Sequence, residues 1–234
     1  MKRRLTHPLG EIEVTRKRIR HLYLRLGNDP AVIRVSAPHR VDDAHLLAFV
    51  TSRAAWIRRQ RDKAARRPPR FDGDRLPEQL HLLGRPYRLV EQHEPRRRRS
   101  AVRVRDEAIH VSVPAGDPPA VRDALRRHCR TQLADILAER VSWWAERMSL
   151  PEPEWRIRRM KTRWGTCNIR ARRIWINLEL VRMPEAVIDL VVVHELAHLI
   201  ERGHNARFYA VMDAHYPAWR EHEGALERFG LIGL

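Results

Sequence analysis

The sequence predicts an α+β protein, because it combines two strand-rich stretches with three helical segments. Short runs of alternating apolar and polar residues fill much of residues 1–115, as is typical of strands. Apolar residues recur at helical spacing in residues 41–65 and 118–148. Residues 186–200 are apolar on almost every side of a helix, which is typical of a helix buried in a core. With 234 residues, the chain is long enough for one large domain or two small ones.

The first strand set is predicted at residues 11–16, 20–26 and 32–37. The Gly-Asn-Asp-Pro sequence at 27–30 predicts the turn between the second and third strands. The helix at 41–65 follows, and the RPPRFDGD sequence at 67–74 is expected to end it. This order predicts a meander of strands followed by a helix.

A second strand set is predicted at residues 79–83, 86–91, 101–105 and 108–113, before the helix at 118–148. The arginine run 96–99 is expected to link two of these strands. IRVSAP at 33–38 resembles IHVSVP at 109–114, and each precedes a helix. We therefore expect an internal duplication of a meander-plus-helix unit. The alternative is that two unrelated strands both end in proline.

The C-terminal half begins with a predicted strand at 155–160, the KTRWGTCN sequence and a returning strand at 172–177. Pro184 is expected to open the next helix, where its missing N–H costs nothing. That helix should end near Arg202, with Gly203 in the left-handed conformation that favours glycine. Further helices are predicted at 205–215 and 218–229. We place the domain boundary between a β-rich region, residues 1–115, with one long helix, and a C-terminal domain, residues 116–234.

The net charge of +17 rests on 42 arginines and only 4 lysines. Such a bias is typical of a GC-rich genome, so a solvated surface is favoured over a nucleic-acid partner. The N-terminus lacks the apolar stretch of a signal or transit peptide, and no segment is long enough to span a membrane. Cys129 and Cys167 form no disulfide framework. We expect a cytoplasmic protein without a membrane partner; nothing in the sequence indicates its oligomeric state.

The most informative stretch is VVVHELAHLIERGH, residues 191–204. Residues four apart lie about 40° apart around a helix, so His194 and His198 project to the same side. Glu195 lies next to His194 and can reach a molecule bound beside a metal. This is the H-E-x-x-H arrangement, in which two imidazoles hold zinc and the glutamate transfers protons.

A catalytic zinc keeps three protein ligands and leaves one position open. His204 is the expected third ligand, because Gly203 lets the chain turn back toward the metal. Glu201 lies one turn beyond His198 and is the main alternative. Histidines and a glutamate also occur in cores with hydrogen-bond partners, but burying three such groups unpaired costs on the order of several kcal/mol. Two other histidines are expected to be surface or packing residues: His215 and His222.

Zinc is the expected metal because imidazole ligands suit it, although nickel or iron also fit such a ligand set. Glu195 is the expected general base. Candidates for stabilising a developing oxyanion are Arg163, Tyr209 and Tyr216.

The stretches KTRWGTCN, IWINLELVRMP, VVVHELAHLIERGH and ARFYAVM resemble the YgjP-like group of metal-dependent hydrolases, which is related to the SprT and WLM zinc metallopeptidases. The resemblance is strong over residues 155–219 and weaker over the N-terminal half. It implies a zincin-like core, with a small sheet packed on the H-E-x-x-H helix and an edge strand beside the cleft. It also implies that His204 completes the metal shell and that Arg163 and Trp164 lie by the cleft. The histidine spacing matches metzincins too, but Glu201 stands where their glycine is expected.

Three functions remain as hypotheses. The favoured one is a metallopeptidase that acts on a peptide or protein substrate, with Arg163, Trp164 and Tyr209 as substrate-binding residues. The second is a phosphohydrolase of the nucleoside triphosphate pyrophosphatase type, because many arginines suit an anionic nucleotide substrate. The third is a DNA-associated protease or binding module, which is an analogy with the SprT and WLM relatives.

Overall fold

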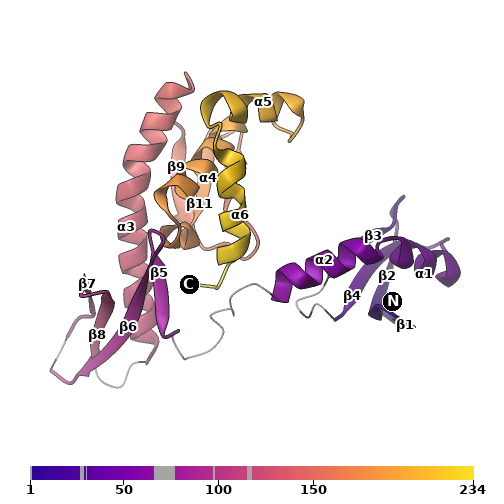
Figure 1. Cartoon of the computed structure of the whole chain (residues 1–234), viewed down its shortest axis with the longest axis horizontal. Helices are drawn as coiled ribbons and strands as arrows, with labels where there is room; N and C mark the ends of the chain where they lie inside the picture. The colour runs from indigo at the N-terminus through magenta and orange to yellow at the C-terminus, as the bar shows by residue number, and fades with distance from the viewer. Residues whose placement is uncertain (1, 27–28, 30, 66–76, 97, 115–117) are drawn as a thin grey trace. The chain divides into compact units, whose positions relative to one another are not determined.

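The computed structural model describes residues 2–26, 29, 31–65, 77–96, 98–114 and 118–234 (Figure 1). Contacts divide the chain into two compact units, an N-terminal unit, Met1–Arg67, and a C-terminal unit, Pro68–Leu234. Both units contain helices and strands, so the predicted α+β class is confirmed. The boundary predicted between residues 115 and 116 lies outside the described residues. Val113 and Val121, on either side of it, belong to one buried cluster.

The N-terminal unit is a four-stranded sheet covered by two helices. The strands are β1 (Lys2–His7), β2 (Gly10–Lys17), β3 (Tyr23–Leu26) and β4 (Ile33–Pro38), in the order β1-β2-β4-β3. β2 and β4 are parallel, and the other two pairs are antiparallel. Alternate residues of the central strands, such as Ile12 and Val35, are buried against the helix residues Leu46 and Ile57. One face of the sheet therefore packs on α1 (Asp43–Ser52) and α2 (Ala54–Ala65).

Two details of this unit differ from the sequence prediction. The single helix predicted at 41–65 is interrupted at Arg53, which caps α1 instead of continuing it. β1 was not predicted, because only Leu5 in its sequence, KRRLTH, is a large apolar residue. The predicted turn at 27–30 and the break at 67–74 fall largely outside the described residues.

The C-terminal unit begins with a second four-stranded sheet. Its strands are β5 (Gln79–Leu82), β6 (Arg85–Glu94), β7 (Ala101–Arg105) and β8 (Ala108–Pro114), in the order β5-β6-β8-β7. β6 and β8 are parallel, and the other pairs are antiparallel. Strand order and strand directions are thus the same as in the N-terminal sheet. IRVSAP forms β4 and IHVSVP forms β8, the equivalent strands.

The long helix α3 (Pro118–Arg147) is the spine of the C-terminal unit, with β5–β8 beside its first part and the remaining elements beside its second part (Figure 1). Its buried residues recur about every fourth position: Val121, Leu125, Cys129, Leu133, Leu137 and Val141. This single stripe joins both parts of the unit into one core. No described helix is both long and apolar enough to cross a membrane.

The site is built by a small sheet and three helices. β9 (Glu154–Arg158), β10 (Gly165–Asn168) and β11 (Arg173–Asn177) form a sheet in the order β10-β11-β9, which leaves β10 at an edge. β10 and β11 are an antiparallel hairpin, whereas β9 and β11 are parallel. A 3₁₀ helix, η1 (Leu178–Arg182), leads to α4 (Glu185–Ala197), and α5 (Ala206–His215) and α6 (Trp219–Phe229) follow. α4 packs against both β10 and β11.

The turn between β5 and β6 fixes the position at which α4 starts. The N–H groups of Leu83 and Gly84 donate to the carbonyls of Val181 (2.8 Å) and Arg182 (3.1 Å). Gly84 has φ +81°, and a Cβ there would lie 2.7 Å from Cγ of Pro184. Only glycine suits both the backbone conformation and this close approach.

α4 ends earlier than the sequence predicts, at Ala197 instead of near Arg202. Leu199 and Ile200 donate to carbonyls three residues back, at 2.9 and 3.0 Å, so the last turn tightens and the chain leaves the helix axis. The prediction of a left-handed Gly203 is wrong, because its φ is not positive. The chain turns back through residues 198–204 without it.

Candidate metal centre

Three histidines come together at the C-terminal end of α4. His194 lies in the last turn of the helix, His198 directly follows it, and His204 lies in the loop before α5. One ring nitrogen from each residue lies within 4.8 Å of the others, and the Nε2 atoms of His194 and His204 are 3.1 Å apart. Nitrogen ligands of one zinc ion stand at about 2.0–2.1 Å from it, so small shifts of the rings would let all three hold a single ion.

The third member of this cluster is His204 and not Glu201. The Nδ1 atom of His198 lies 3.2 Å from the carbonyl oxygen of Glu201, which favours a proton on Nδ1 and leaves Nε2 for a metal. The Glu201 carboxylate accepts a hydrogen bond from the N–H of Gly203 at 3.3 Å instead. Among the described residues, the metal-suited cluster consists of the three histidines.

Phe208 of α5 forms an apolar support under the three rings. Its ring centroid lies 5.0, 4.8 and 4.7 Å from those of His194, His198 and His204. Phe208 is only 1% exposed. Asn205 caps α5 by accepting the N–H of Phe208 at 3.1 Å, so the helix starts directly after His204. Phe208 thus packs against all three imidazoles.

Glu195 is buried beside the histidines, with 4% of its surface exposed. Burial raises the pKa of Glu195 to about 8, and the Arg163 guanidinium opposes this shift. Its Oε2 atom is buried and has no hydrogen-bond partner among the described residues. Because buried oxygens are almost always hydrogen-bonded, this atom requires a partner that the described residues do not supply. A metal-bound molecule beside the three imidazoles fits that requirement.

The edge strand β10 lies directly against Glu195. A Cβ at Gly165 would stand 2.7 Å from Cγ and 2.8 Å from Cδ of Glu195, and closer still to Oε1. The loop before β10 is held by buried Asn177, whose Nδ2 donates to the carbonyls of Met160 (2.9 Å) and Arg163 (2.7 Å). Glycine in the strand and asparagine behind it therefore set the distance between strand and carboxylate.

The histidines and Glu195 face a cavity of about 740 Å³, within the range of about 300–1,000 Å³ that ligand pockets occupy. Gly165, Thr166 and Cys167 of β10 form one side. The apolar lining comes mainly from the helices: Leu190, Val191, Phe208, Met212, Trp219 and Leu226. Arg163, Arg202 and Glu223 add charge. The cleft is thus mainly apolar, with a few charged groups near the candidate metal ligands.

Sequence comparison places the chain in a family. A model described as a YgjP-like metallopeptidase domain matches residues 20–229. The chain belongs to the YgjP-like family. This membership makes it a metal-dependent hydrolase and confirms the resemblance seen in the sequence.

Two solved structures of metallopeptidase zymogens are similar to parts of this YgjP-like chain. Abylysin of Pyrococcus abyssi is 17% identical, with a TM-score of 0.38, and the match covers 41% of this chain and 99% of abylysin. Jannalysin of Methanocaldococcus jannaschii is 16% identical, with a TM-score of 0.36, and the match covers 38% of this chain and 92% of jannalysin. Comparison with curated proteins gives no significant match.

The surroundings of these histidines favour neutral imidazole rings. Burial, together with the nearby His198 and His204, lowers the pKa of His194 to about 4. Burial also lowers the pKa of His198. Imidazoles must be neutral to coordinate a metal, so the lowered values favour the binding form at neutral pH.

Most of the residues singled out in the sequence reach the cleft. Arg163, Trp164 and Tyr209 line it, and the Tyr209 ring stacks on Trp219 at 5.6 Å. Tyr216 does not line it, because its hydroxyl donates to the carbonyl of Ala186 at 2.7 Å. His215 and His222 lie outside the histidine cluster, as expected.

Several residues of the YgjP-like site were not predicted from the sequence: Phe208, Gly165, Asn177 and Cys167. The first three act through contacts with segments that are remote in sequence, and local sequence patterns do not predict such contacts. Burial and the Glu195 charge raise the pKa of Cys167 to about 11. Cys167 is therefore a neutral thiol at physiological pH and a weak nucleophile.

Proposed function

We propose that this protein is a zinc peptidase that hydrolyses peptide bonds in the cleft beside α4. One observation carries the proposal: three imidazoles within 4.8 Å share a cavity with a buried glutamate oxygen that has no partner in the described part of the chain. His194, His198 and His204 would hold the metal. Three protein ligands leave a fourth position open, as catalytic zinc requires.

Glu195 carries the proton chemistry in this proposal. Bound zinc supplies Lewis acidity, which lowers the pKa of water toward about 7 and polarises a carbonyl oxygen. Glu195 accepts the proton of the attacking water and returns it to the leaving amine. Arg163 and Tyr209 line the cleft as candidates for stabilising the oxyanion.

β10 offers a docking edge for an extended peptide. β10 pairs with β11 on one side, and its other side is an edge of the described sheet. Gly165, Thr166 and Cys167 of this strand line the cleft. A peptide added as a further strand would form main-chain hydrogen bonds to β10. Its scissile bond would then lie in the cleft that β10, Glu195 and the three histidines line, which supports a peptide or protein substrate.

A nucleotide phosphohydrolase is the second candidate. Arg163 and Arg202 line the same cleft, and guanidinium groups bind phosphate oxygens well. The edge strand and the mainly apolar lining favour the peptide instead. The two candidates use the same metal and the same glutamate, so only the substrate separates them.

The test is a parallel screen with zinc-loaded protein. Quenched peptide libraries and the common nucleoside triphosphates are offered to the wild type and to Glu195→Gln at equal zinc content. We expect peptide cleavage that the variant lacks. Phosphate or pyrophosphate release without peptide cleavage, lost in the same variant, would establish the second candidate. Unchanged hydrolysis by Glu195→Gln would refute the role of this glutamate in both.

For the architecture, we propose that β1–α2 and β5–α3 descend from one duplicated unit. The identical strand order and directions support this, as does the equivalent position of IRVSAP and IHVSVP. Across relatives, similarity between the two stretches should exceed that of randomly paired strands. Similarity at the random level would contradict the duplication.

A further inference from the structure

The positive charge of the chain is concentrated in the N-terminal unit. Residues 1–67 contain 17 lysines and arginines against 6 acidic residues, a net charge of +11. Residues 68–234 contain 29 against 23, a net charge of +6 over more than twice the length. A bias in nucleotide composition acts on both units alike, so it does not explain this difference. From the sequence we expected a solvated surface throughout; the division into units changes that expectation for residues 1–67.

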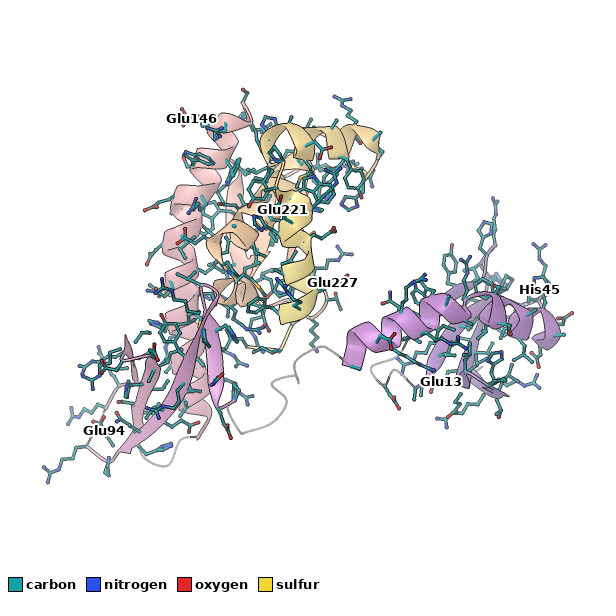
Figure 2. All side chains as sticks on the ribbon, in the orientation of Figure 1. Glu13, His45, Glu94, Glu146, Glu221 and Glu227 are labelled. Carbon is teal, nitrogen blue, oxygen red and sulfur yellow. The ribbon has the colours of Figure 1, made fainter. Side chains whose placement is uncertain are left out.

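Most acidic residues of this unit form ion pairs or hydrogen bonds within the unit itself. Glu13, labelled in Figure 2, pairs with Arg34 at 3.0 Å. Asp43 pairs with both Arg3 (2.7 Å) and Arg16 (2.9 Å). Asp42 instead caps α1 by accepting the N–H of His45 at 2.7 Å. These contacts neutralise arginines of the sheet and leave other cations of the unit in excess.

Part of this excess lies where the two parallel strands end. Lys17, the last residue of β2, lies opposite Pro38, the last residue of β4, so the two following loops leave the same edge of the sheet. Both loops are rich in exposed cationic or titratable side chains, which we name the basic edge: Lys17, Arg18, Arg20, His21, His39 and Arg40. Within the described residues, no acidic side chain pairs with any of its lysine or arginine members.

The basic edge is held in place by a structural arginine. The guanidinium of Arg16 donates to the carbonyl of Pro38 at 3.1 Å and also to that of Val41, while it pairs with Asp43. The loop after β4 is thereby tied to the end of β2. Exposed cations on the two loops keep a fixed relation to each other, which a charge-binding surface requires.

An exposed aromatic ring lies beside these cations. Tyr23 begins β3 directly after the first basic loop and lies opposite Ser36, two residues before the end of β4. It is 58% exposed, and no other large hydrophobic residue is exposed in the described part of this unit. Cations and an exposed ring supply the two interactions that proteins use on nucleic-acid single strands, namely charge contacts with phosphates and stacking of a base on an aromatic side chain. A membrane-binding surface would present several apolar side chains instead.

We propose that the N-terminal unit binds single-stranded nucleic acid, with the basic edge on the phosphates and Tyr23 stacked on a base. The proposal does not depend on the metal centre. It gives the unit a role separate from hydrolysis, namely to hold the protein on a nucleic acid.

The test uses the full-length protein and a fluorescently labelled single-stranded oligothymidine, with anisotropy measured over a series of salt concentrations. The edge variant replaces Arg18, Arg20 and Arg40 by Gln. The control variant replaces Arg53, Arg58 and Arg59, three arginines in and between α1 and α2 of the same unit, by Gln. Both variants lose the same charge, and circular dichroism verifies that each is folded.

We expect the edge variant to bind at least about tenfold more weakly, and its salt dependence to fall by about 2 in log–log slope, since each phosphate contact contributes about 0.7. The control variant should stay within about threefold of the wild type. Tyr23→Ala should bind the oligonucleotide about fivefold or more weakly. Tyr23→Phe should keep most of the affinity, because stacking needs only the ring. Glu195→Gln and metal chelation should leave binding unchanged.

Three results would overturn the proposal. The first is an equal loss of affinity in the edge and control variants, which would mean that binding depends only on the net charge of the unit. The second is wild-type affinity in the edge variant or in Tyr23→Ala. The third is binding to phosphatidylglycerol vesicles with none to the oligonucleotide, which would assign the surface to a membrane. None of these outcomes bears on peptide cleavage, so this proposal and the proposed function fail independently.

Discussion

Gly165 of β10 and Glu195 of α4 are in direct contact, with no room between them for a methyl group. A Cβ at residue 165 would lie 2.7 Å from Cγ and 2.8 Å from Cδ of the glutamate. The edge strand and the proposed general base are therefore set at a distance that only glycine permits.

Replacing Gly165 by Ala should reduce activity far more than stability. The Glu195 side chain must turn or β10 must shift, and a displacement of about 1 Å at a reacting group costs on the order of 10²-fold in rate. The overpacking itself should cost about 1–3 kcal/mol in the free energy of unfolding. Peptide cleavage and urea unfolding measure the two effects on the same sample.

Gly224→Ala is the matched control for this change. A Cβ at Gly224, inside α6, meets no atom within 4 Å. Activity should be unchanged, and the helix should gain up to about 1 kcal/mol. Full activity in Gly165→Ala would show that the contact with Glu195 has no catalytic consequence.

Removal of the ring under the histidines should weaken both the fold and the metal site. Phe208→Ala deletes a fully buried ring, which costs about 3–5 kcal/mol, and frees the three imidazoles to reorient. Phe208→Leu keeps most of the side-chain volume, so its stability and zinc affinity should lie between those of Phe208→Ala and the wild type. Unfolding with and without a zinc chelator separates the two effects. Zinc affinity unaltered by Phe208→Ala would mean that the ring does not position the ligands.

Asn177 should affect activity by holding the loop that precedes β10. Asn177→Ala removes the donor that holds the carbonyls of Met160 and Arg163, and loss of such buried hydrogen bonds costs about 1–3 kcal/mol. Because this loop leads into Gly165, the catalytic rate should fall as well. Asn168→Ala, at the exposed end of β10, is the control: it removes only the bond that the Ala171 N–H donates at 3.1 Å and should leave the catalytic rate almost unchanged. A purely structural role would lower stability and leave the rate of the folded enzyme intact.

The sequence predicted those parts of the protein whose local structure is determined by residues that are neighbours in the chain. The α+β class, most strands and the position of His194 and Glu195 on a buried helix follow from local periodicity. His204 joins the cluster as predicted, although the predicted left-handed Gly203 is not what turns the chain. The helix predicted at 205–215 matches α5, which Asn205 caps.

Other features depend on contacts that local patterns do not contain. α4 ends at Ala197 because its last turn tightens and the chain must return toward His194, whereas the apolar pattern continues to Ile200. β9 pairs in parallel with β11, a relation between strands separated by a hairpin. The packing of Phe208 under the imidazoles likewise exists only once α5 has folded back on α4.

The central claim, a metal held by three histidines, is tested most directly by equilibrium zinc titration of His204→Ala and Glu201→Ala. These two residues are the alternative third ligands, and the structure places His204 in the cluster. We expect His204→Ala to lose more than about 100-fold in zinc affinity, because losing a direct ligand should cost more than the 10–100-fold of an outer-shell partner. Glu201→Ala should bind zinc almost as well as the wild type. Wild-type affinity in His204→Ala, or a larger loss in Glu201→Ala, would contradict the three-histidine site.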